Sequence, residues 1–192
     1  VAFDKTGTLT VGHPQLVSIH ALAGAESEVL KLATAIQSNS EHPLARAVLA
    51  SARQASISPV VATDVRVLPG RGIAATVNGQ SYELGSTRLM QERGVDIQVL
   101  DGPRIDLERE GRTLSWLALA GASPRLIGLL AFSDAPKPSA GAAIARLHDQ
   151  HIATVMITGD LEAAARTVAQ GLGIEHVRAE VLPADKAEVV ST

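Results

Sequence analysis

The octapeptide Phe3-Asp4-Lys5-Thr6-Gly7-Thr8-Leu9-Thr10 decides how this chain is interpreted. It places a carboxylate, Asp4, at the end of a short apolar run, Val1-Ala2-Phe3, which is typical of a β-strand. A lysine follows at once, and the next residues have small side chains that suit a phosphate group. An aspartate in this position can attack a phosphoryl group and form an acyl phosphate. Such a reaction needs positioning and charge neutralisation more than acid–base chemistry.

The composition of the 192 residues narrows the classes of function. Apolar residues make up 46% and aromatic residues 2%, so we expect a core of Val, Leu, Ile and Ala. The net charge of −3 argues against a nucleic-acid partner. The absence of cysteine excludes disulfides and thiolate metal sites. No apolar segment reaches the ~18–20 residues of a membrane span, and no signal peptide is evident, so we expect this chain itself to be soluble. We also expect it to be monomeric.

The middle of the chain has the pattern of an α+β domain. Amphipathic helices are predicted at 26–36 and 44–53, and strands at 63–67, 72–77 and 80–84. Asn78-Gly79, between the last two strands, predicts a type I′ hairpin. Asp101-Gly102-Pro103 predicts a break, which is followed by a short helix at 105–110 and by strands at 114–119 and 126–132.

After Pro138, helices and short strands alternate as in a parallel α/β sheet. Helices are predicted at 140–149, 163–172 and 184–190, and strands at 154–157 and 177–179. We therefore expect an α/β domain at residues 1–12 and 126–192. Residues 14–122 are expected to form an α+β insertion with an antiparallel sheet.

The octapeptide resembles the phosphorylation motif of the P-type ATPases, ion pumps within the haloacid-dehalogenase-like superfamily. The resemblance implies a truncated, Rossmann-type phosphorylation domain interrupted by a nucleotide-binding domain. It implies that ATP phosphorylates Asp4 and that Lys5 lines the site. It also implies that Thr6 contacts the phosphate, and that Asp4 and the Thr6 carbonyl help to hold Mg²⁺.

Three further segments resemble the same family. Thr158-Gly159-Asp160 follows a predicted strand, where ligands bind in open α/β sheets. The resemblance implies that Thr158 binds phosphate and that Gly159 and Asp160 belong to the nucleotide and Mg²⁺ surroundings. Lys186 resembles the family lysine that meets the phosphoryl group. Asp134 matches the family's aspartate at the hinge between the domains.

The segment Ser40-Glu41-His42-Pro43-Leu44 resembles the nucleotide-site signature of the heavy-metal branch. That resemblance implies that Glu41 and His42 orient ATP near the adenine, and that Gly70 and Gly72 form the branch's glycine pair. Ser86 stands where many copper pumps have an asparagine. Many other P-type ATPases stack the adenine on a phenylalanine of the nucleotide-binding domain. Here both phenylalanines, Phe3 and Phe132, are expected in the phosphorylation domain.

The transported ion and the reaction class each have alternatives. Residues 112–117 and 179–186 resemble bacterial copper pumps, which favours Cu⁺ export, whereas Ser86 leaves a Zn²⁺ or Cd²⁺ pump open. A soluble phosphatase of the superfamily, with a cap domain, would have a second acid where this chain has Thr6. A nucleotide-binding module without turnover is the third interpretation.

The resemblance also implies partners beyond ATP. These are the actuator domain, the membrane helices and any metal-binding domains of the same pump, with the parent in the cell membrane and this region in the cytoplasm. The family completes its Mg²⁺ site with a Gly-Asp-Gly-x-Asn-Asp segment soon after the equivalent of Lys186. Since the sequence reaches Thr192 without that segment, we expect this chain to bind nucleotide with little or no turnover.

Overall fold

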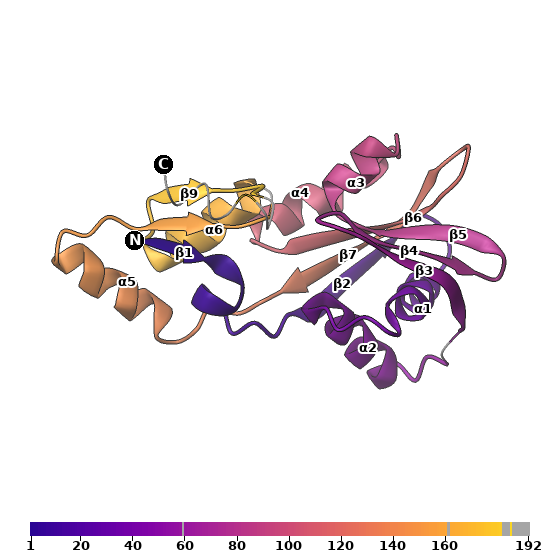
Figure 1. The fold of residues 1–192 in the computed structure, drawn as a ribbon, viewed down its shortest axis with the longest axis horizontal. Helices are drawn as coiled ribbons and strands as arrows, with labels where there is room; N and C mark the ends of the chain where they lie inside the picture. Colours follow the sequence, from indigo (N-terminus) through magenta and orange to yellow (C-terminus); the bar gives the residue numbers. More distant parts are fainter. Residues whose placement is uncertain (59, 161, 182–184, 186–192) are drawn as a thin grey trace. The chain divides into compact units, whose positions relative to one another are not determined.

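The computed structural model describes residues 1–58, 60–160, 162–181 and 185 (Figure 1). The chain forms two compact units. Unit 1 comprises Val1–Pro14, Asp106–Thr113 and Ser133–Thr192, and unit 2 comprises Gln15–Ile105 and Leu114–Phe132. None of the helices in the described part of the chain is both long enough and apolar enough to cross a membrane.

Unit 1 contains a parallel sheet in the order β1-β8-β9, formed by β1 (Ala2–Asp4), β8 (Val155–Ile157) and β9 (His176–Arg178). Helices α5 (Ala140–Asp149) and α6 (Glu162–Leu172) precede and follow β8, so the expected helix–strand alternation is confirmed. The core is small and rich in alanine. Its buried members are Leu9, Ala140, Ile144, Met156, Ala165, Ala169, Leu172 and Ile174.

Unit 2 is built on a six-stranded sheet in the order β2-β7-β6-β5-β4-β3. Neighbouring strands from β3 to β6 pair antiparallel. The strands are β2 (Gln15–Ala21), β3 (Ala62–Leu68), β4 (Gly72–Val77), β5 (Gln80–Gly85), β6 (Thr113–Leu119) and β7 (Arg125–Ser133). Asn78 and Gly79 both have positive φ, at 51° and 76°, which confirms the predicted hairpin between β4 and β5.

Helices cover both faces of this sheet. Helices α1 (Glu26–Gln37) and α2 (Pro43–Gln54) pack on the face that carries Tyr82 and Leu84 (Figure 1). Side chains alternate between the two faces along a strand. Trp116 of β6 lies opposite Gly85 rather than Leu84, so its side chain points to the other face. There its indole N–H donates to the Thr87 hydroxyl of α3 (Thr87–Glu92) at 3.0 Å. Strand β6 is therefore covered on both faces, whereas most of β3 is exposed.

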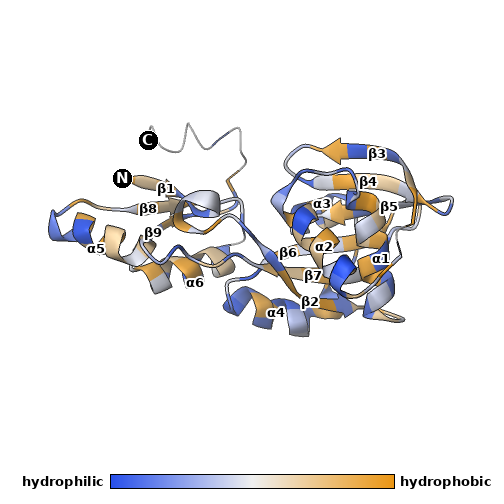
Figure 2. Ribbon diagram, turned by 90° about the horizontal axis from the view of Figure 1, so that it is seen from below, coloured by the Kyte–Doolittle hydropathy of each residue, from blue (hydrophilic) through white to orange (hydrophobic). Residues whose placement is uncertain are grey.

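The segment that follows α3 differs from the prediction. A short 3₁₀ turn, η2 (Gln98–Leu100), leads directly into α4 (Asp101–Arg109), so the break expected at Asp101-Gly102-Pro103 is wrong. Glycine and proline are tolerated here because they lie in the first turn, where the N–H groups have no intrahelical partner. Figure 2 shows α4 largely blue, in line with its many charged residues.

The structure also corrects the expected boundary between the domains. Residues 126–132 were assigned to the phosphorylation domain, but they form most of β7, between β2 and β6 in the sheet of unit 2. Phe132 is 1% exposed in the core of that unit. Strand β7 is apolar on both faces because helices cover it on both sides. In the sequence, such a continuous apolar run has the same pattern as a strand of a parallel α/β sheet, which explains the wrong assignment. The helix predicted at 184–190 lies outside the described residues, apart from Asp185.

Candidate functional site

Asp4 ends β1, and a tight loop, Lys5–Leu9 (η1), follows it. Asp4 pairs in register with Ile157 at the end of β8, so the carboxyl ends of the two parallel strands meet at one edge of the sheet. Gly7 has a φ of 76°, a conformation that glycine adopts without strain. This edge is where open α/β sheets bind ligands.

The loop is held from behind by Thr10, which is fully buried. Its backbone N–H donates to the Lys5 carbonyl at 3.1 Å, and its hydroxyl accepts from the Gly7 N–H at 3.1 Å. The Thr6, Gly7 and Thr8 side of the loop is exposed. The arrangement therefore presents an open, anchored loop directly after the Asp4 carboxylate.

Asp134 and Lys137 anchor the same loop from the segment after β7. The Asp134 carboxylate lies 2.5 Å from the Thr10 hydroxyl and accepts from the Gly12 N–H at 3.1 Å. The Lys137 ammonium donates to the Gly7 carbonyl at 2.7 Å. Asp134 was expected at a hinge, and here its carboxylate bonds with the chain just before that chain enters unit 2.

Lys5 is buried beside Asp160, which lies just after β8. The Lys5 ammonium forms an ion pair with the Asp160 carboxylate, and the two side chains are 5% and 14% exposed. The Thr158 hydroxyl lies 2.9 Å from the same carboxylate oxygen. A buried ion pair is stable only where further hydrogen bonds satisfy its polar atoms. The structure therefore joins the octapeptide to the Thr158-Gly159-Asp160 motif.

A residue that the sequence analysis missed completes this cluster. The Thr113 hydroxyl lies 3.2 Å from Asp160 Oδ1, and the Lys5 ammonium donates to it at 3.4 Å. Thr113 is the first residue of β6 and is grouped with unit 1. No sequence signal indicated it, because a single threonine before a strand is common. Lys186, which was predicted to meet the phosphoryl group, lies outside the described residues.

Asp4 and Thr6 offer the oxygen ligands that Mg²⁺ prefers, a carboxylate and a carbonyl. No group of three or more His, Cys, Asp and Glu side chains suited to a metal is found among the residues that the structure describes. This donor set suits Mg²⁺, which is usually held by one or two carboxylates together with phosphate and water. It does not suit a metal that needs an all-protein cage.

His42 caps the start of α2 in unit 2. Its Nδ1 accepts from the Leu44 N–H at 3.2 Å, so the neutral ring carries its proton on Nε2. Desolvation lowers the pKa of His42 from the ordinary value of 6.5. The residue is nevertheless exposed, as is Glu41. The Nε2–H of a neutral ring remains as a donor for a ligand.

Of the predicted glycine pair, Gly70 has a φ of 69°, and Gly72 lies at a very close approach of two backbones. A Cβ on Gly72, whose φ is 154°, would come 2.2 Å from the Leu84 carbonyl. A Cβ on Gly85, its partner across β4 and β5, would come 2.2 Å from the Arg71 carbonyl. Packing alone therefore demands glycine at positions 72 and 85. Gly85 was not among the predicted residues, although its place before Ser86 could have indicated it.

The neighbouring polar groups hold this close approach in place. The Ser86 N–H donates to the Arg71 carbonyl at 2.8 Å, and the Ser86 hydroxyl caps α3 by accepting from Leu89 N–H at 3.3 Å. The Arg71 guanidinium donates to the Glu92 carboxylate of α3 at 2.6 Å, and this hydrogen bond lowers the pKa of Glu92. In the described part of the chain, no hydrogen bond links His42 to the glycine pair.

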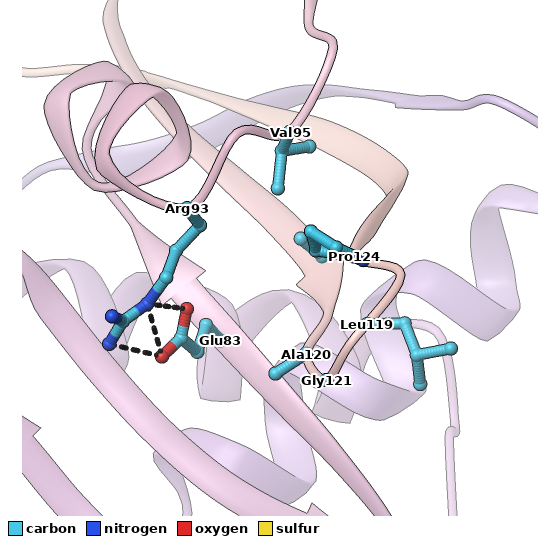
Figure 3. A pocket seen from close by; sticks show the side chains of 8 residues that line it. Glu83, Arg93, Val95, Leu119, Ala120, Gly121 and Pro124 are labelled. Carbon is cyan, nitrogen blue, oxygen red and sulfur yellow. Dashed lines mark hydrogen bonds and ion pairs between the residues drawn. The ribbon is translucent and has the colours of Figure 1, made fainter.

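A hollow of about 220 Å³ lies elsewhere in unit 2 (Figure 3). Arg93 reaches into it and forms a two-pronged ion pair with Glu83, whose side chain is 9% exposed. Hydrogen bonding to the Glu83 carboxylate raises the pKa of Arg93. The lining includes none of the predicted nucleotide residues, and its only charged groups satisfy each other. We therefore do not assign the nucleotide to this hollow.

Comparison with known proteins identifies relatives over the whole chain. Residues 1–192 match the family described as haloacid dehalogenase-like hydrolase. A copper-exporting P-type ATPase of Vibrio cholerae serotype O1 is 40% identical over 188 residues, which cover 98% of this chain and 20% of that protein. The chain thus spans about a fifth of the length of this curated relative.

Solved structures agree with the sequence relatives. A zinc-transporting PIB-type ATPase in an E2·Pi state is 34% identical with a TM-score of 0.63, over 99% of this chain and 30% of that one. The catalytic domain of the CPx-ATPase CopB-B has a TM-score of 0.74 at 21% identity, over 99% and 64%. The last comparison shows the fold alone. Together, the comparisons confirm the fold class and the resemblance to heavy-metal P-type ATPases.

Proposed function

Since the chain belongs to the haloacid dehalogenase-like hydrolase family, we propose that it is the ATP-binding, autophosphorylated region of a heavy-metal-exporting P-type ATPase. One observation carries the proposal. Asp4 stands at the carboxyl end of β1, and Lys5 beside it is paired with Asp160 from the end of the neighbouring strand. A nucleophilic carboxylate and a buried cation therefore come together at one sheet edge. The name of the Vibrio cholerae relative supports this proposal.

In the proposed reaction, a carboxylate oxygen of Asp4 attacks the γ-phosphorus of ATP. A new O–P bond forms as the bond to the ADP oxygen breaks. The Lys5 ammonium offsets the negative charge of the transferred group, and the exposed loop Thr6–Thr8 offers it polar groups. Water later attacks the phosphorus of the acyl phosphate, which releases inorganic phosphate and restores the Asp4 carboxylate.

Mg²⁺ is the cofactor that this donor set suits. The Asp4 carboxylate and the Thr6 carbonyl would hold it, with phosphate oxygens and water as further ligands. When bound, the ion neutralises part of the phosphate charge. Lys186 is proposed as a second cation for the same phosphoryl group, on the strength of the motif alone.

Unit 2 is proposed as the nucleotide-binding domain and unit 1 as the phosphorylation domain. His42 offers its Nε2–H to ATP, beside Glu41. Gly70 and Gly72 would let the nucleotide approach the backbone, and the Ser86 hydroxyl would lie beside them. The packing demand on Gly72 does not contradict this role, because a glycine can serve both.

The proposed cargo is Cu⁺, with Zn²⁺ or Cd²⁺ as the alternative. The 40% identity to a copper exporter favours Cu⁺, while the zinc-transporting neighbour is 34% identical. The partners would be the actuator domain, membrane helices and any metal-binding domains of the same pump, with this region on the cytoplasmic side. Metal-stimulated ATPase activity of the full-length pump, compared between Cu⁺ and Zn²⁺, decides between the two ions.

The central test is formation of an acyl phosphate by the full-length pump. We expect radioactive γ-phosphate from ATP to label the protein, to be released by hydroxylamine, and to be absent from the variant Asp4→Asn. Labelling that survives in Asp4→Asn would refute the assignment of the nucleophile.

The same experiment separates the two alternatives. A soluble phosphatase of the superfamily would hydrolyse a simple phosphomonoester quickly and accumulate little phosphoenzyme. A module without turnover would bind ATP and show no label in any variant. We expect neither of these results.

A further inference from the structure

Among the described residues of the partly buried cluster around Lys5, Thr113 is the one that no motif indicated. Its hydroxyl lies 3.2 Å from Asp160 Oδ1, and it accepts from the Lys5 ammonium at 3.4 Å. It therefore bonds with both partners of the ion pair at once. No other side chain in the described hydrogen-bond network does this.

The two oxygens of the Asp160 carboxylate have different partners. Oδ2 pairs with the Lys5 ammonium and lies 2.9 Å from the Thr158 hydroxyl, while Oδ1 has the Thr113 hydroxyl. Thr158 comes from the same turn as Asp160 and therefore moves with it. Thr113 comes from a distant part of the sequence, so it fixes the carboxylate relative to a second element.

We propose that Thr113 is a positioning residue for the phosphoryl transfer, a role that rests on the proposed function. Its hydroxyl holds the Asp160 carboxylate in the rotation at which Lys5 is shared between that carboxylate and the incoming phosphoryl group. Without it, the carboxylate is free to turn and to shift the ammonium with which it is paired. Small displacements of a group that neutralises transition-state charge are costly in rate.

Two conservative substitutions of Thr113 and one control substitution elsewhere in unit 1 test this role. Thr113→Val keeps the shape and removes the hydroxyl, whereas Thr113→Ser keeps the hydroxyl. Thr167→Val makes the same change in unit 1, where the Thr167 hydroxyl donates to the Arg109 carbonyl at 3.1 Å.

The first measurement is the rate of acyl-phosphate formation in the full-length pump at several ATP concentrations. In Thr113→Val the rate at saturating ATP should fall about tenfold, as expected when a hydrogen bond to a charged group is lost. The ATP concentration for half-maximal rate should not change. Thr113→Ser should restore the rate, and Thr167→Val should leave it unchanged.

Three results would overturn the proposal: an undiminished rate in Thr113→Val, an equal loss in Thr113→Ser, or a loss of ATP affinity with the maximal rate intact. The last result would make Thr113 a nucleotide contact.

A second measurement does not depend on the phosphorylation reaction. In NMR spectra of the 192-residue chain without nucleotide, Thr113→Val should shift the Asp160 carboxyl carbon and the Lys5 ammonium nitrogen, and Thr113→Ser should not. If both resonances stay in place in Thr113→Val, the inference fails, whatever the pump does. If the wild-type pump forms no acyl phosphate, the proposed function fails, while the spectra still decide whether Thr113 holds the pair.

Discussion

At the scale of single residues, His42 has two separable tasks. Its Nδ1 caps α2, which is a structural task, and its Nε2–H is proposed to meet ATP. A capping side chain typically contributes on the order of 1 kcal/mol to stability. Substitutions that keep one task and remove the other can therefore tell the two apart.

Replacing His42 with glutamine should weaken ATP binding by ~1–2 kcal/mol, the loss expected for one or two hydrogen bonds. Calorimetric titration of the chain with ATP measures this directly. His42→Asn is the matched control, because asparagine is a good cap and glutamine is not. Both variants should lose affinity, but His42→Asn should keep more thermal stability. Unchanged affinity in both variants would remove His42 from the nucleotide site.

The lowered pKa of His42 also predicts how stability depends on pH. Desolvation disfavours the charged ring in the folded state, so the unfolded chain binds its proton more readily below pH 6.5. The stabilising contribution is therefore complete above pH 6.5 and is lost as the pH falls towards the folded-state pKa. Thermal melts between pH 5 and 7.5 should show a steeper decline for the wild type than for His42→Asn. Parallel declines would contradict this assignment.

At the scale of elements, the close contact of β4 and β5 depends on the absence of two Cβ atoms. A methyl group at position 85 would meet the Arg71 carbonyl at 2.2 Å and a Leu89 methyl at 2.8 Å. Backbone atoms cannot yield as a flexible side chain can. The strands would have to move apart, and the capped start of α3 with them.

Gly85→Ala should therefore destabilise the chain by ~1–3 kcal/mol, the usual cost of overpacking. Chemical denaturation monitored by circular dichroism measures the loss. Gly102→Ala is the control in the same unit, because a Cβ there meets nothing within 4 Å. It should be neutral or slightly stabilising, since alanine is favoured over glycine in a helix. Equal stability of the two variants would show that the contact relaxes easily.

At the scale of the whole molecule, β7 decides where unit 2 can be cut. It lies between β2 and β6 in the sheet and contributes buried residues. These residues are Leu126, Leu129, Leu130, Ala131 and Phe132. A cut at residue 122, where the sequence patterns place the boundary, would separate β2 from the other strands.

We expect a fragment of residues 15–132 to fold and to bind ATP by itself, with little dependence on Mg²⁺, because the proposed Mg²⁺ ligands lie in unit 1. A fragment of residues 14–122 should not fold, because it lacks β7. Amide NMR spectra and ATP titration of both fragments provide the test. A folded 14–122 fragment would show that β7 is dispensable, and a folded 15–132 fragment without ATP binding would show that the nucleotide site needs unit 1.

The sequence by itself determined the features that depend on neighbouring residues. The Asp4 loop after a strand, the Asn78-Gly79 hairpin and the helices α1 and α2 follow from local conformational preferences and from periodicity. Local rules succeed there because the required backbone shape and the residues that favour it lie in the same few positions.

Only the tertiary structure decided the contacts between distant segments. It placed β7 in the sheet of unit 2, set Gly85 against the Arg71 carbonyl and brought Thr113 to the Lys5–Asp160 pair. A buried apolar strand fits either kind of sheet, and a lone threonine or glycine has no pattern around it. For Gly85 and Thr113, the nearest of these partners along the chain is 14 positions away and the farthest is 108, so no short window of sequence contains them.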